Sequence, residues 1–165
     1  MPSEIQVQED EPILPIKLHA GSYPPMDYAY CEGQVLDIGN YPDLYNVIGN
    51  VYGGDGVTTF AIPDLRQDEK DYNGVRFIIS LSGATDDMDF ISAIAAFNGA
   101  DAPQGWFFCE GQLIGLEYSN LFSLIGTLYG GDGKTNFGLP DLRNIVREMD
   151  YKYCICYQGV YPGRN

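Results

Sequence analysis

Two glycine-rich loops are the stretches of this 165-residue sequence whose residue types come closest to a chemical site. Gly133-Lys134-Thr135 has the ending of a phosphate-binding P-loop, but that motif also needs a glycine five positions before Gly133, where the chain has Leu128. Each loop carries one aspartate, Asp55 or Asp132, whereas a calcium loop needs several carboxylates at alternating positions. Asp-Gly pairs are typical of tight turns, so both loops are predicted to be structural.

The other ionisable residues form no catalytic constellation in the sequence. Asp64 and Arg66, repeated as Asp141 and Arg143, follow a proline and stand two residues apart. This spacing favours an aspartate that accepts backbone N–H bonds in a turn, and an arginine that pairs with it or with a neighbouring subunit. His19 is the single histidine, so neither a histidine metal site nor a Ser-His-Asp triad can form within one chain. We therefore expect no enzyme, no cofactor and no metal site.

The four cysteines indicate buried thiols rather than disulfides. Cys31 and Cys109 occupy equivalent positions of a repeated Cys-Glu-Gly-Gln segment, so the same buried role is expected of both. The glutamate of that segment is expected to be solvated or to cap a turn. Cys154 and Cys156 are two apart in a strand-like run, which places both on one face and disfavours a bond between them. No Cys-x-x-Cys pair is present for zinc.

These motifs occur twice because the chain is an internal duplication. Residues 41–66 and 118–143 are identical at 15 of 26 positions, far above chance. We expect an acidic N-terminal arm at 1–12, a first module at 13–83, a linker at 84–89 and a second module at 90–165. The repeated residues that we expect to form the scaffold are Cys31, Gly33, Tyr52, Gly53, Gly54, Asp55, Gly56, Pro63, Asp64, Arg66, Trp106, Cys109, Gly111, Tyr129, Gly130, Gly131, Asp132, Gly133, Pro140, Asp141 and Arg143.

Hydrophobic periodicity predicts one short helix in each module. Asn40 is the predicted N-cap of the first helix, with Pro42 in its first turn, and Gly49 and Gly126 should end the two helices. The apolar positions with helical spacing are Tyr41, Leu44, Tyr45 and Ile48 in the first copy, and Tyr118, Leu121, Phe122, Ile125 and Leu128 in the second.

Short strands are predicted around each helix. They lie at residues 13–16, 28–31, 58–60 and 75–81, and in the second copy at 90–97, 106–109, 135–137 and 151–157. The acidic segments 67–74 and 144–150 are predicted to be linkers. The fold class is therefore α+β: a tandem duplication of a small β-rich module with one short helix per repeat. Each module has about 70 residues, a size at which one core is marginally stable, so the copies should pack against each other or against other subunits.

The composition limits the kinds of partner that the protein can bind. A net charge of −14 argues against nucleic acid and against anionic membranes. No apolar run approaches the ~18–20 residues that cross a bilayer. The acidic start of the chain is unlike a secretory leader, so we expect synthesis in a cytoplasm without a signal peptide. The 13 tyrosines suit surfaces that are half-buried in contacts. The duplication and these tyrosines together lead us to expect a homo-oligomer and to suspect a trimer.

The repeated motif resembles the phage tail collar domain. It runs Gly-x-x-x-Pro-x-Gly-Trp-x-x-Cys-Glu-Gly-Gln, and continues through a helix to Tyr-Gly-Gly-Asp-Gly and Pro-Asp-Leu-Arg. Residues 99–143 carry it in full, and residues 21–66 carry it with Asp27-Tyr28 in place of Gly-Trp. The C-terminal segment 153–162 is similar to the end of the bacterial relatives called microcystin-dependent proteins.

The resemblance implies a structural or assembly protein of a phage tail or of a tail-derived contractile injection system, as a tail fibre, tip or collar component. It implies a location in the virion tail or an extracellular injection particle, with other tail, baseplate or fibre proteins as partners. The alternative is a receptor-binding adhesin module at a fibre tip that recognises a cell-surface glycan or protein through exposed aromatic residues.

Overall fold

The structure, a computed structural model, describes residues 15–83, 90–145 and 151–164. Repeat 1 contributes β1 (Ile16–His19), β2 (Tyr28–Tyr30), β3 (Val35–Asp37), α2 (Pro42–Ile48), β4 (Thr59–Ala61), the 3-10 helix η2 (Asp68–Tyr72) and β5 (Arg76–Ser80). Repeat 2 contributes β6 (Ala93–Asn98), β7 (Trp106–Phe108), β8 (Leu113–Gly115), α3 (Ser119–Ile125), β9 (Asn136–Gly138) and β10 (Tyr151–Cys156). Over these described ranges the fold is β-rich with one short α-helix in each repeat, which confirms the predicted α+β class.

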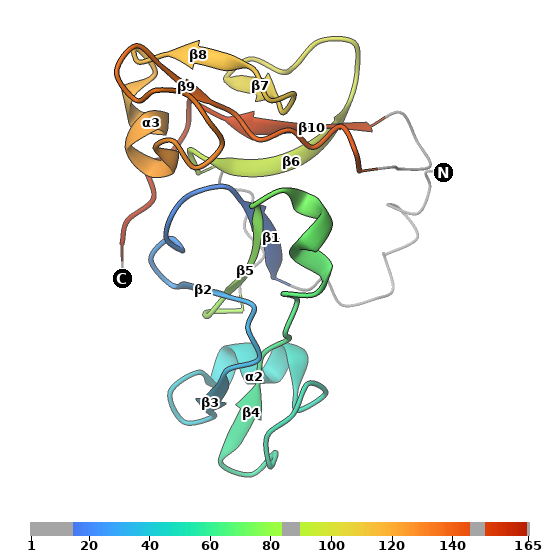
Figure 1. Cartoon of the computed structure of the whole chain (residues 1–165). Helices are drawn as coiled ribbons and strands as arrows, with labels where there is room; N and C mark the ends of the chain where they lie inside the picture. The colour runs from blue at the N-terminus through green and yellow to red at the C-terminus, as the bar shows by residue number, and fades with distance from the viewer. Residues whose placement is uncertain (1–14, 84–89, 146–150, 165) are drawn as a thin grey trace.

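One antiparallel six-stranded sheet joins the two repeats. Its order, β2-β5-β1-β6-β10-β7, is palindromic, because β1, β2 and β5 correspond in sequence to β6, β7 and β10. The halves meet at β1 and β6, where Leu18 lies opposite Ile94 and His19 opposite Ala93. Each half also carries a two-stranded sheet, β3-β4 or β8-β9, close to its helix (Figure 1).

The two repeats also share a hydrophobic core. In repeat 1 the core is formed by Cys31, Leu44, Ile48, Phe60, Ile62 and Ile79. The repeat 2 core, around α3 and β9, includes Ala20 and Val75 of repeat 1 as fully buried members. The modules therefore stabilise each other, as their small size requires.

The helices begin and end close to the predicted positions, with two corrections. Asn40 was predicted as the N-cap, but the cap residue is Tyr41, without a side-chain bond, because backbone bonds to the Asp37 carbonyl already form the preceding turn. Leu128 was predicted on the buried helix face, but α3 ends at Ile125 and Leu128 is 61% exposed. The reason is Gly126, whose positive φ turns the chain away while its N–H bonds the carbonyl of residue 122.

Several predicted strands differ in their bounds. The segment predicted at 90–97 becomes a strand only at Ala93, because Ser92 has a φ of 78° and interrupts the extended backbone. The segment predicted at 13–16 becomes β1 and begins at Ile16, while residues 13 and 14 lie outside the described residues. Segment 67–74, predicted as a linker, contains η2. Strands β3 and β8 were not predicted.

Candidate functional site

The aspartates of the two glycine-rich loops organise their own turns. Asp55 Oδ1 accepts the N–H groups of Val57, Thr58 and Thr59, each at 2.8 Å. Asp132 makes the same three bonds in repeat 2, at 2.8 to 3.1 Å. These backbone bonds lower the pKa of both carboxyl groups far below the ordinary value of an aspartate. The carboxylates are thus used inside the loop, which confirms the predicted turn.

The glycines before each aspartate allow a close approach of two backbones. At Gly131 the φ is 90° and a Cβ would lie 2.4 Å from the Cα of Phe137. At Gly54 the φ is 88° and a Cβ would lie 2.4 Å from the Cα of Phe60. Both phenylalanines are fully buried. The loop therefore lies directly on the strand that fills the core, and only glycine fits there.

The Pro-Asp-Leu-Arg motif forms a self-contained ion pair, as predicted. Arg66 donates to both oxygens of Asp64, at 2.9 and 2.7 Å, and Arg143 does the same to Asp141, at 2.9 and 2.8 Å. The arginine bonds lower the pKa of each aspartate to about 2. Because both pairs are largely exposed, they fix local geometry more than they stabilise the fold.

The Cys-Glu-Gly-Gln and Pro-Asp-Leu-Arg motifs bind each other through their backbones. In repeat 1 the Gly33 N–H donates to the Pro63 carbonyl at 3.1 Å, and the Leu65 N–H donates to the Cys31 carbonyl at 2.9 Å. Repeat 2 has the same bonds, from Gly111 to Pro140 at 3.2 Å and from Leu142 to Cys109 at 3.0 Å. In each module, these backbone bonds therefore hold the Cys-Glu-Gly-Gln segment against the Pro-Asp-Leu-Arg segment.

All four cysteines are buried and free, as predicted. Burial raises the pKa of the Cys31 thiol to about 12 and that of Cys154 to about 11, and it raises the pKa of Cys109 as well. A thiol that does not ionise is a poor nucleophile. Trp106, which is buried in one cluster with Cys154 and Cys156, packs edge-on against Phe97 at 4.9 Å between ring centroids.

The glutamate of the Cys-Glu-Gly-Gln segment differs from the expectation in repeat 1. Glu32 forms an ion pair with Arg76, whose Nε also lies 3.2 Å from Glu69. The Arg76 guanidinium stacks 3.8 Å from the centre of the Tyr30 ring. Sequence reasoning missed this cluster because Arg76 lies 44 residues from Glu32 and 7 from Glu69, and because neither Arg76 nor Glu69 belongs to a repeated motif.

His19 is buried at the junction of the two repeats, hydrogen-bonded to Ser92 across 3.3 Å. Burial lowers its pKa to about 4. Its imidazole is therefore neutral and inaccessible to solvent. Within the described ranges, no group of three or more His, Cys, Asp or Glu side chains could hold a metal ion.

The tyrosine of the Tyr-Gly-Gly-Asp-Gly motif has a different role in each repeat. The Tyr129 hydroxyl donates to the Ala20 carbonyl of repeat 1 at 2.8 Å and lies 3.4 Å from the Gly74 carbonyl. Its counterpart Tyr52 is 41% exposed. The tyrosine of repeat 2 therefore bonds to repeat 1, whereas its counterpart in repeat 1 is exposed, although the strand order of the sheet is palindromic.

These motifs, each built twice, are the features by which the chain can be compared with known proteins. The family model of the phage tail collar domain matches residues 15–69 and 92–146, about two thirds of the chain. The chain belongs to the phage tail collar domain family. It carries two tandem collar domains, which confirms the resemblance seen in the sequence. Comparisons with curated proteins and with solved structures gave no match.

A collar domain identifies the protein as a structural component of a phage tail, of the kind found in tail fibres. The collar domain is not known as an enzyme family. No helix in the part of the chain that the structure describes is long and apolar enough to cross a membrane. The division at residues 13, 84 and 90 stays a prediction, and the arm at 1–12 and the linker at 84–89 lie outside the described residues.

Proposed function

We propose that this collar-domain protein is a non-catalytic assembly component of a phage tail or of a tail-derived contractile injection particle, and that it self-associates as a trimer. The observation that supports self-association is a pair of apolar side chains exposed at the same place in both repeats. Val35 and Leu113 are 62% and 57% exposed, and Val51 and Leu128 are 79% and 61% exposed. We call these four residues the hairpin patches, one pair per repeat.

The two members of each hairpin patch lie on neighbouring segments. Val35 on β3 is opposite Ala61, whose N–H donates at 3.0 Å to the carbonyl of Gly53, two residues after Val51. In repeat 2 the matching bond joins Gly138 to Gly130 at 2.9 Å. The same local structure therefore presents the same pair of apolar side chains twice.

Exposed apolar side chains that recur at one place favour a repeated contact with a partner. The patches are uncharged, so copies of this acidic chain would meet there without adding repulsion. A trimer would contain six collar domains around an axis, which suits the three- and six-fold symmetry of tail particles.

Sedimentation velocity of the full chain at micromolar concentration tests the proposal. We expect a species of three times the 18.3 kDa chain mass for the wild type, and a monomer for Val51→Asp/Leu128→Asp. Val57→Asp is the matched control, because Val57 is 79% exposed but corresponds to Lys134 and is not part of a repeated patch. A stable wild-type monomer, or equal dissociation by the control, would contradict self-association through the patches.

The second candidate function is that of an adhesin module at a fibre tip. A pocket with aromatic and polar side chains in repeat 1 favours it. Deleting residues 1–12 in the phage or particle separates the two roles. Particles that lack the protein would support assembly, while intact particles that no longer bind their host would support the adhesin.

A further inference from the structure

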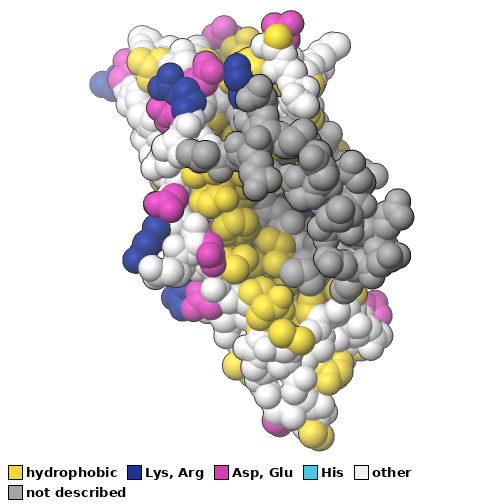
Figure 2. All heavy atoms as spheres, turned by 90° about the vertical axis from the view of Figure 1, so that its right-hand side faces the viewer, with side chains coloured by type: hydrophobic (Ala, Val, Ile, Leu, Met, Phe, Trp, Pro, Cys, Tyr) yellow, Lys and Arg dark blue, Asp and Glu magenta, His cyan; other side chains and the backbone are white. Residues whose placement is uncertain are grey.

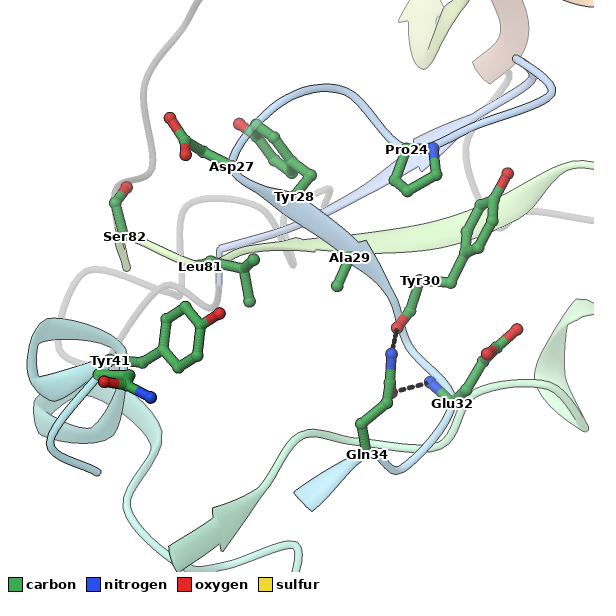
Figure 3. Close-up of a pocket in the computed structure, with 11 residues that line it drawn as sticks. Pro24, Asp27, Tyr28, Ala29, Tyr30, Glu32, Gln34, Tyr41, Leu81 and Ser82 are labelled. Carbon is green, nitrogen blue, oxygen red and sulfur yellow. Dashed lines mark hydrogen bonds between the residues drawn. The ribbon is translucent and has the colours of Figure 1, made fainter. Parts of the chain in front are cut away.

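Repeat 1 contains a pocket of about 750 Å³ beside the edge strand β2 (Figure 3). This volume falls within the ~300–1,000 Å³ that small-molecule sites occupy. The side chains that matter for its chemistry are Ala29, Glu32, Gln34, Asn40, Tyr41 and Leu81. With the other lining residues, the pocket combines apolar side chains, three tyrosines, two amides and two carboxylates, Glu32 and Asp27.

In repeat 2, aromatic side chains occupy the positions that correspond to the walls of this pocket. At the positions of Ala29 and Leu81, repeat 2 has Phe107 and Tyr157, whose rings stack at 4.3 Å between centroids. Both rings also pack edge-on against Tyr118, at 5.0 and 5.3 Å. Repeat 1 replaces the two stacked rings by a methyl and an isobutyl group. The volume that aromatic packing fills in one domain is therefore left open in the other.

Tyr41, the counterpart of Tyr118, keeps its ring at the edge of this space. Figure 3 shows Tyr41 and Leu81 on one side of the space and Gln34 with Glu32 across from them, with Ala29 between. In the described part of the chain, Tyr118 packs against two rings, whereas no ring contact is found for Tyr41. Tyr41 is half-buried against the repeat 1 core and also lines the pocket, so part of its side chain borders the space open to a ligand.

The polar groups of the pocket are held in place. Gln34 Nε2 donates to the Tyr30 carbonyl at 2.8 Å, while Gln34 Oε1 accepts the Glu32 N–H at 2.9 Å. The Glu32 carboxylate is held by Arg76. Fixed polar groups in an otherwise partly apolar pocket provide orientation and specificity for a small ligand.

We propose that this pocket binds a saccharide unit, neutral or N-acetylated. A sugar ring has an apolar C–H face that can lie on Tyr41 and against Leu81, and hydroxyl groups that both donate to a carboxylate and accept from amides such as that of Asn40. Anionic sugars are disfavoured by Asp27 in the lining and by the net charge of −14. The binding site goes beyond the proposed assembly role and does not rest on it.

An extended peptide added to the edge of β2 is the competing occupant. It is less favoured because backbone groups of this strand already have partners. The Tyr28 N–H donates to the Pro25 carbonyl at 3.0 Å, and Gln34 binds the Tyr30 carbonyl. A peptide would have to displace these bonds before it could pair with the strand.

The test is an NMR titration of the ¹⁵N-labelled full chain with N-acetylglucosamine, galactose and N-acetylneuraminic acid. For a neutral sugar we expect saturable shifts confined to residues around Ala29, Asn40 and Leu81, with a Kd on the order of 1 mM. Ala29→Phe/Leu81→Tyr rebuilds the ring stack of repeat 2, so it should preserve the fold and weaken binding at least ~10-fold. Asn40→Ala, at an exposed position, should weaken binding without affecting folding.

Val57→Phe, which adds an aromatic ring outside the pocket lining, is the matched control and should bind as the wild type does. The proposal is overturned if neither neutral sugar gives a saturable shift up to about 50 mM, or if Ala29→Phe/Leu81→Tyr and Asn40→Ala bind as tightly as the wild type. It is equally overturned if N-acetylneuraminic acid is preferred, or if a Thr-Val-Thr-Val peptide shifts these residues and the sugars do not.

Discussion

Replacing Gly131 by alanine is expected to destabilise the protein more than the same replacement at Gly126. Both glycines have positive φ, 90° and 53°, so alanine is strained at either position. At Gly126 nothing lies within 4 Å of an added Cβ, whereas at Gly131 the Cβ would be 2.4 Å from the Cα of the buried Phe137. The pair of variants therefore separates backbone strain from the close approach of two backbones.

The expected losses of unfolding free energy follow from backbone strain and from the close approach of the two backbones. Backbone strain at a positive φ costs about 1–3 kcal/mol, which both variants should show. At Gly131 the contact is about 1 Å shorter than the 3.4 Å at which ordinary van der Waals contact begins, so strand β9 or the loop must move. Overpacking of this kind costs a further ~1–3 kcal/mol. We therefore expect Gly131→Ala to lose about twice as much free energy of unfolding as Gly126→Ala.

Urea unfolding of both variants measures the difference, read as a change of midpoint at a constant m-value. Gly54 and Gly49 repeat the comparison in the other collar domain, because a Cβ at Gly54 would also lie 2.4 Å from a buried Cα, and nothing lies near Gly49. Losses that agree within about 0.5 kcal/mol for Gly131→Ala and Gly126→Ala would refute the argument that the loop is fixed by this approach.

Three further outcomes are expected. Hydrogen bonds from the backbone N–H groups of Thr135, Lys134 and Asn136 lower the pKa of Asp132. The stabilisation by this carboxylate is therefore complete above about pH 4 and is lost as the pH falls toward the lowered pKa. The variant Asp132→Asn should flatten that part of a curve of Tm against pH. Tyr129→Phe should lower the free energy of unfolding by ~1 kcal/mol, since it leaves a carbonyl of the other repeat unpaired. The cysteine thiols should resist iodoacetamide at neutral pH until the chain unfolds.

A different result would contradict each of these three predictions. An acid-induced loss of Tm that is the same in Asp132→Asn and the wild type would remove the loop carboxylate from the pH dependence. Tyr52→Phe is the matched control for Tyr129, because the exposed Tyr52 should tolerate the loss of its hydroxyl, and equal losses would contradict the one-sided contact. Rapid alkylation of the native chain, followed by mass spectrometry, would contradict the burial of the thiols.

Much of the fold could be predicted because its signals are local. The helix spacing and the glycines at 49 and 126 predicted both helices to within a few residues. The aromatic strands were predicted because their residue types favour extended backbone. The bounds failed where a single backbone conformation decided them, as at Ser92, whose positive φ no sequence pattern announces.

The structural motifs were predicted well and the pocket was not. The bonds of Asp55 and Asp64 reach only two to four residues along the chain, so residue types at fixed offsets are sufficient to infer them. The pocket depends on Ala29 and Leu81, which are 52 positions apart and unremarkable in sequence. The signal that could have found it is the comparison of the two repeats, in which small residues replace Phe107 and Tyr157.

The sequence by itself determined the duplication, the α+β class, the turns and the family, because these follow from residue types and short offsets repeated in two copies. Only the tertiary structure decided how the copies meet. Three features depend on contacts between distant segments: the palindromic sheet, the bond from Tyr129 to repeat 1 while its counterpart Tyr52 is exposed, and the open pocket of repeat 1. Near-identical motifs acquire different surroundings when they pack against each other, and the surroundings decide which side chains remain available to a partner.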